Sequence, residues 1–168
     1  KPVNAEEKEQ MAFIRPVEID THLVANPRAN YGIYLINMLI PGVLQLIVIM
    51  MTIFNLGTEL KEGTGAAWFQ TAGGSSGLAL FGKLLPYTLL FTSLGIISNL
   101  ILFRFMQFTF QGSMLYMCLA TFLFVASSQA AAVFFSGLLP LMRDAISLGA
   151  FYGLLGFTYA GFTFPIEA

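Results

Sequence analysis

Residues 33–56 read IYLINMLIPGVLQLIVIMMTIFNL and contain no charged side chain. A run of ~20 apolar residues is long enough to cross the ~30 Å hydrocarbon core of a bilayer as a helix. A spanning strand would alternate apolar and polar residues, and this run does not alternate. The stretch therefore predicts a membrane-spanning helix.

The rest of the chain has the same character. Of its 168 residues 57% are hydrophobic and only 10% are charged, whereas a soluble domain carries roughly 25% charged residues. The composition predicts an all-α integral membrane protein, a polytopic bundle with about four transmembrane helices. The expected spans are about 33–56, 84–104, 113–138 and 145–163.

The charged residues divide the chain into regions. Residues 1–30 are charged and predict a short water-facing segment before a transmembrane domain at 31–168, in which 57–83 forms a polar, glycine-rich connection. The net charge of −1 does not indicate a nucleic-acid partner. Lys and Arg normally mark the cytoplasmic side. Here each side carries three near the membrane, so charge alone does not orient the chain.

A G-x-x-x-x-G-K string from Gly77 to Lys83 resembles part of a phosphate-binding loop. Such a loop places Ser or Thr after the Lys to hold Mg²⁺, but Leu84 follows here and an apolar run comes next. We therefore expect no ATPase site in this chain. We expect Lys83 to mark the membrane boundary with its ammonium snorkelling to the headgroups.

Small and kinking residues indicate how the helices pack. Gly149 and Gly153 form G-x-x-x-G, and residues 127–132 read SSQAAA; both patterns predict close helix contacts, within this subunit or between two subunits. Pro41 and Gly42 predict a kink that is either a hinge or a fixed bend.

Few polar side chains lie at membrane depth. Gln45, Asn99 and Gln129 are expected to form interhelical hydrogen bonds rather than to contact substrate. The spans carry no ionisable residue away from their ends, which argues against a membrane-embedded enzyme. His22, the one histidine, lies outside the spans, so we expect no metal site.

Five pieces in order carry a family resemblance: NPRANYGIYLINMLIPG entering a span, TELKEGTGAAWF leaving it, GKLLPY entering the next, FQGS at the following turn and AGFTFPIEA at the end. Over residues 26–168 the chain resembles the permease subunit of a type-2 ATP-binding-cassette (ABC-2) exporter. That family has six spans per subunit. The resemblance implies that 1–30 end an extracytoplasmic segment, that the four spans are the second to fifth, and that 57–83 is cytoplasmic.

The resemblance also implies that 57–83 couples the permease to an ATPase. A short helix there could insert aromatic side chains into a partner's groove, with the acidic residues guiding the contact. The alternative is an interfacial helix whose aromatic rings rest among the headgroups. The residues expected in this coupling loop are Glu59, Glu62, Gly63, Thr64, Trp68, Phe69, Gly82 and Lys83.

A second family stretch implies an extracytoplasmic re-entrant turn at the end of the chain. Irregular backbone at membrane depth is tolerated only where protein buries it or water reaches it. The alternative is an ordinary helix end at the surface. The matching residues are Gly161, Phe162, Phe164, Pro165 and Glu167.

The function implied is that of an exporter permease, embedded in the lipid bilayer, which works with an ABC ATPase subunit and a second permease subunit. ATP and Mg would be held by the ATPase, with no cofactor on this chain. The bacterial inner membrane is the expected location. The apolar lining with a few amides favours an amphiphilic substrate. The alternative is a membrane scaffold, or a permease-like protein that uses ATP for mechanical signalling and transports nothing.

Overall fold

The structure, a computed structural model, describes residues 31–105, 112–139 and 141–159. Every regular element in these ranges is helical, which confirms the all-α fold. The predicted water-facing segment at 1–30 lies outside the described residues. The elements are α2 Tyr31–Glu62, the short α3 Gly65–Thr71, α4 Ser76–Leu100, the π-helical turn η1 Ile101–Phe105, α5 Met114–Leu138 and α6 Met142–Phe157.

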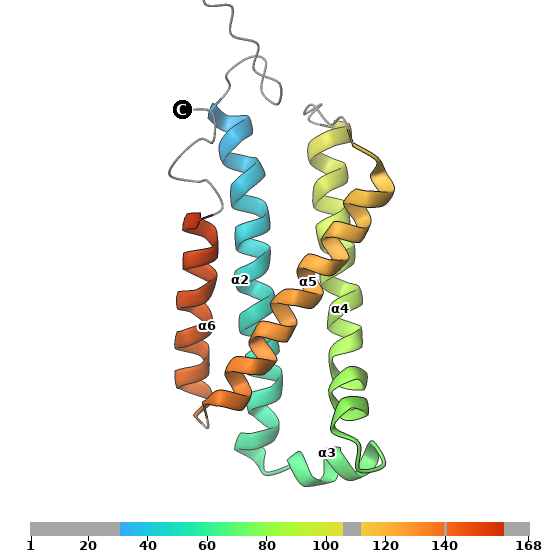
Figure 1. Cartoon of the computed structure of the whole chain (residues 1–168), viewed down its shortest axis with the longest axis vertical. Helices are drawn as coiled ribbons and strands as arrows, with labels where there is room; N and C mark the ends of the chain where they lie inside the picture. Colours follow the sequence, from blue (N-terminus) through green and yellow to red (C-terminus); the bar gives the residue numbers. More distant parts are fainter. Residues whose placement is uncertain (1–30, 106–111, 140, 160–168) are drawn as a thin grey trace, which may run out of the picture. The chain divides into compact units, whose positions relative to one another are not determined.

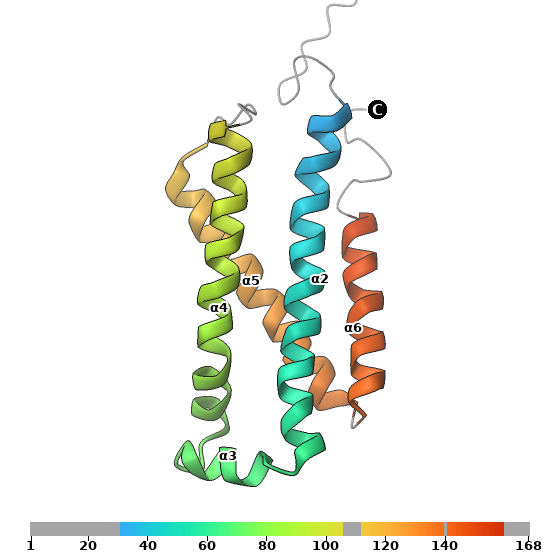
Figure 2. The same ribbon diagram turned by 180° about the vertical axis from the view of Figure 1, so that it is seen from behind.

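The helices are arranged around α2 (Figure 1). Helices α2 and α4 run in opposite directions, and α3 joins them crosswise at one end. Helix α5 returns obliquely from the far end of α4 towards the start of α6, and α6 packs along α2. Seen from behind, α5 lies on the opposite side of α2 and α4 from the viewer (Figure 2), so it crosses one face of that pair.

Within the part of the chain that the structure describes, three helical segments are long and apolar enough to cross a membrane: Leu35–Glu62, Ser76–Arg104 and Met114–Leu138. Helix α6 has 16 residues, or about 24 Å at ~1.5 Å per residue, which is shorter than a full crossing. The fourth span predicted at 145–163 ends among residues that the structure does not describe. It therefore stays a prediction.

The connection between the first two long helices is shorter than the sequence predicts. Helix α2 continues to Glu62 and α4 begins at Ser76, so much of 57–83 is helical. Lys and Glu sustain a helix well in water, so α2 extends beyond its apolar run. Gly63, at φ +70°, ends α2 in the left-handed conformation that favours glycine.

Two clusters of buried side chains hold the bundle together, on adjacent sides of α2. Val48 meets Phe91 of α4 and Val125 of α5. One residue further along, Ile49 begins the second cluster, which Ile53 completes on α2 together with Ala132 and Phe135 of α5 and Ala145 of α6. Helix α2 is therefore the element about which the others pack.

Close contact between α2 and α6 depends on glycine. A Cβ at Gly149 would lie 2.6 Å from Ile53 Cδ1, and one at Gly153 would lie 2.9 Å from Leu46 Cδ1. A side chain at either position would force these α2 side chains to shift, so the glycines permit the close approach of the two helices. The G-x-x-x-G pattern therefore packs helices within this chain.

Two of the predicted amides join α4 to α5. Asn99 Nδ2 donates to Thr121 Oγ1 at 3.1 Å. The Thr88 hydroxyl lies 2.6 Å from Gln129 Oε1 and 2.9 Å from the Leu84 carbonyl oxygen, and its one proton serves one acceptor at a time. Gln129 Nε2 is buried with no hydrogen-bond partner among the described residues.

Substitutions at the two ends of the Thr88–Gln129 hydrogen bond are expected to lower stability by different amounts. Thr88→Val leaves both polar ends of a buried amide unpaired, which costs about 1–3 kcal/mol. Gln129→Leu removes the amide altogether, and an interhelical hydrogen bond in a membrane is worth only about 0.6 kcal/mol. We expect Thr88→Val to lower the thermal midpoint in detergent more than Gln129→Leu does. The reverse order would contradict this account.

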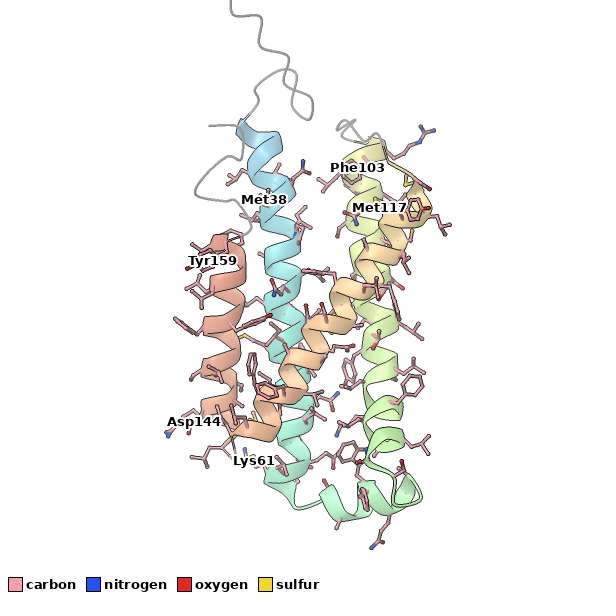
Figure 3. The ribbon with its side chains drawn as sticks, in the orientation of Figure 1. Met38, Lys61, Phe103, Met117, Asp144 and Tyr159 are labelled. Carbon is pink, nitrogen blue, oxygen red and sulfur yellow. The ribbon has the colours of Figure 1, made fainter. Side chains whose placement is uncertain are left out.

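The outward faces of the helices are apolar. On α4 the exposed side chains include Leu78, Phe81, Leu89, Leu94 and Ile97. Figure 3 shows side chains projecting from all the long helices away from the bundle. Apolar surface on this scale is typical of contact with lipid rather than with water.

Candidate functional site

Helix α3 is fixed tightly to the end of α2. Thr64 N donates to the carbonyl oxygen of Glu59 at 3.1 Å, and Trp68 N donates to that of Thr64 at 3.0 Å. At the other end Gly74, at φ +77°, donates from its N to the carbonyl oxygen of Phe69 at 3.0 Å. The backbone therefore ties the start of α3 to the end of α2, and a glycine turn ends α3.

A polar cluster at this end joins three helices. Lys83 Nζ of α4 donates to Glu59 Oε1 of α2, and the hydroxyl of Thr64, just before α3, donates to Glu59 Oε2. Both carboxylate oxygens are thus engaged. The side chains of Lys83 and Glu59 are only 14% and 24% exposed, so the pair is better shielded than a typical surface ion pair.

Trp68 completes the cluster from α3. The Lys83 ammonium lies 5.1 Å from the centroid of the Trp68 ring, within the ~6 Å range of a cation–π interaction. Trp68 is half-buried beneath this ammonium. We name Glu59, Thr64, Trp68 and Lys83 the clamp, because together they hold α2, α3 and α4.

The clamp gives Lys83 protein partners that the sequence does not predict. Its ammonium turns towards Glu59 and Trp68, and its position relative to the headgroups stays a prediction. The G-x-x-x-x-G-K string lies in α4 as a regular helix rather than as a loop. The backbone N–H groups around Gly82 are therefore bonded along the helix and cannot cradle phosphates. This fits the prediction that the string is not a nucleotide site.

A cavity of about 280 Å³ lies beside the clamp. Four polar or aromatic residues in its walls were not predicted from the sequence: Phe54, Asn55, Thr58 and Tyr87. Two of these four lie four residues away from a predicted residue. Asn55 shares a helix face with Glu59, and Tyr87 shares one with Lys83. The cavity is lined by Met51, Phe54, Asn55, Thr58, Glu59, Lys83 and Tyr87.

The other predicted coupling residues face outward. Phe69 on α3 is 43% exposed, and Glu62 at the end of α2 is exposed. Trp68 therefore serves the clamp, and Phe69 is the aromatic side chain that α3 presents outward. Gly82 is exposed on α4, and a Cβ added there would meet no atom within 4 Å.

The structure leaves part of the predicted site undescribed. The re-entrant stretch with Gly161, Phe162, Phe164, Pro165 and Glu167 lies outside the described residues. Within residues 31–105, 112–139 and 141–159, no three His, Cys, Asp or Glu side chains come together as metal ligands would.

Comparison with known proteins gives one match. The sequence model of a family described as "ABC-2 family transporter protein" matches residues 3–168, nearly the whole chain. No curated protein and no solved structure matches the chain. The family match agrees with the resemblance found in the sequence.

Proposed function

Because this chain belongs to the ABC-2 transporter family, we propose that it is the permease of an exporter driven by a partner ATPase. ATP and Mg²⁺ would then be bound and turned over on the partner. Nothing in the clamp resembles a phosphate site, because Lys83 is already paired with Glu59. The permease would supply the membrane path and the surface on which the ATPase acts.

The observation that carries this proposal is the clamp. An ATPase that moves α3 can move the membrane helices only if α3 is fixed to them. Lys83 contacts both Glu59 of α2 and Trp68 of α3. A displacement of α3 would therefore reach α2 and α4 together, which is what a coupling helix requires.

Phe69 and Glu62 supply the contact with the ATPase in this proposal. A partly exposed aromatic residue at the centre of an interface is a common source of binding energy. A nearby carboxylate adds attraction to a basic patch and speeds association. Both side chains lie at the end of the bundle that α3 occupies, which would be the cytoplasmic end.

The assembly would contain a second permease subunit, which completes the path through the lipid bilayer, and the bacterial inner membrane is the proposed location. The walls of the described helices are apolar with a few amides, which favours an amphiphilic substrate. Transport of such a molecule would need polar contacts strong enough to select it but weak enough to release it.

The proposal is tested by purifying the full-length protein in a mild detergent and identifying the proteins that accompany it. We expect a stoichiometric ATPase with vanadate-sensitive turnover. Phe69→Ala should weaken its association at least about tenfold, as loss of an interface hot spot does. Glu62→Lys should abolish transport while the protein remains folded in the membrane.

Gln70→Ala is the matched control, since Gln70 is also exposed on α3 but carries no aromatic ring. It should leave the association within about threefold of the wild type, because most contacts at an interface are energetically near-neutral. A preparation without any ATPase, bound or fused, would refute the exporter proposal and favour the scaffold. ATPase activity without transport would instead favour mechanical signalling.

A further inference from the structure

A second cavity, of about 290 Å³, lies between α2, α4 with η1, and α5. Its walls include Leu44 of α2, Gly95 and Asn99 of α4, and Phe124 of α5. Phe103 and Met117 also line it, and Figure 3 shows both at the end of the bundle remote from α3. This cavity is therefore separate from the clamp.

One polar side chain in this cavity keeps hydrogen-bonding capacity. Asn99 Nδ2 donates to Thr121 Oγ1 at 3.1 Å, and Thr121 Oγ1 donates to the Met117 carbonyl oxygen at 2.8 Å. No described residue donates a hydrogen bond to Asn99 Oδ1. An amide oxygen can accept two hydrogen bonds, so Asn99 can receive a donor from a ligand.

The lining also restricts the charge of a ligand. Among the described residues that line the cavity, none is ionisable. A charged group placed there would lose its hydration without gaining a counter-ion, which is costly within a membrane. A neutral molecule with a hydrocarbon body pays little desolvation cost on binding, because the remaining walls are mostly aliphatic and aromatic.

Access to the cavity comes from its outer wall. Pro41 and Ala120 both line it and are both exposed. Large apolar side chains on the same helices, such as Val43 and Leu119, are exposed beside them, as expected for surface in contact with lipid. A molecule dissolved in the bilayer can therefore reach the cavity without crossing water.

We propose that this cavity binds a neutral amphiphile from the bilayer, with its hydrocarbon body between α2 and α5 and its hydroxyl group donating to Asn99 Oδ1. The site does not depend on the proposed ATPase coupling. It requires only that these helices lie in lipid. Its volume is at the lower end of the ~300–1,000 Å³ typical of ligand pockets, which suits one chain or a small ring system.

The test uses the full-length protein in lipid nanodiscs and a long-chain primary alcohol that carries a diazirine on its chain. After photolysis, mass spectrometry maps the labelled residues. We expect saturable labelling of the segments that contain Phe103, Met117 and Phe124. Hexadecanol should compete, and hexadecyl sulfate, which carries a permanent charge, should compete at least about tenfold less well.

Substitutions locate the site. Ala120→Phe fills the cavity from an exposed position and should abolish the saturable label. Ala130→Phe is the matched control, because Ala130 is exposed on the same helix outside the lining; it should label as the wild type does. Labelling spread evenly along α5, or unchanged by Ala120→Phe, would overturn the proposal.

Two further variants distinguish a hydrogen bond from the ligand to Asn99 from an effect of side-chain packing. Asn99→Leu keeps the size of the side chain but removes the acceptor, and should weaken labelling about fivefold, the effect of one hydrogen bond. Gln129→Leu removes the other amide that joins α5 to α4 and lies outside the lining, so labelling should persist. An equal loss in both variants would refute Asn99 as the anchor.

Discussion

Reversing the charge of Lys83 with Lys83→Glu is expected to reduce ATP-driven transport to the level of an ATPase-inactive control. The substitution places a second carboxylate beside Glu59 and removes the cation above the Trp68 ring. Like charges at this distance repel, and both clamp contacts of Lys83, to Glu59 of α2 and to Trp68 of α3, are lost. A displacement of α3 would then be transmitted less directly to α4.

Two measurements check this prediction. Transport in proteoliposomes should fall, while trypsin cleavage after Lys61, which is exposed beside α3, should become faster. The double variant Glu59→Lys/Lys83→Glu restores opposite charges and should recover part of the transport, as coupled positions do in a double-mutant cycle. Equal loss in the single and double variants would show that the ion pair is not the source of the effect.

Arg143→Glu serves as the matched control for charge reversal. Arg143 lies at the start of α6, where its Nε is 3.4 Å from Asp144 Oδ1 and its side chain is 86% exposed. Exposed ion pairs of this kind contribute about 0–1 kcal/mol. We expect transport close to that of the wild type.

Replacing Gly149 with leucine is expected to prevent α6 from packing on α2. A Cβ alone would lie 2.6 Å from Ile53 Cδ1 and 2.8 Å from Ile49 Cγ2, and both isoleucines are at most 1% exposed. Both side chains would have to shift within the buried cluster to admit a larger residue. Overpacking a well-packed core costs about 1–3 kcal/mol for extra methylenes, and leucine adds four carbon atoms.

The expected result is a large loss of monodisperse protein in size-exclusion chromatography after expression. Gly137→Leu is the control, since Gly137 on α5 has no atom within 4 Å of an added Cβ. Its yield should match the wild type. Adding Ile53→Ala to Gly149→Leu should recover part of the yield. A normal yield from Gly149→Leu alone would mean that the α2–α6 contact does not support assembly.

The sequence predicts the helices of this fold well because membrane helices depend mainly on hydropathy. An uncharged run must be buried in lipid or protein, so 113–138 predicts α5 to within one residue at its start. The ends of α2 and α4 are less predictable. Helix α2 continues past its apolar run into charged sequence, and α4 begins at Ser76, ahead of the predicted start at 84. Hydropathy marks neither boundary.

The clamp is only partly predictable. Family resemblance indicates its residues, and the sequence predicts the short helix with Trp68. The pairing of Glu59 with Lys83 depends on how α4 returns beside α2, over a separation of 24 residues. No local periodicity contains that information. This is why the sequence alone favours the headgroups as the partner of Lys83.

The oblique course of α5 has a mechanical consequence. Near its start α5 bonds to α4 through Thr121, and near its end it packs on α2 and α6 through Ala132 and Phe135. Two helices connected only at one end, as α2 and α4 are by α3, can slide past each other. A third helix that packs obliquely on both, as α5 does, prevents this sliding. In the proposed transporter, a displacement of α3 would therefore tilt these helices together rather than slide one past another.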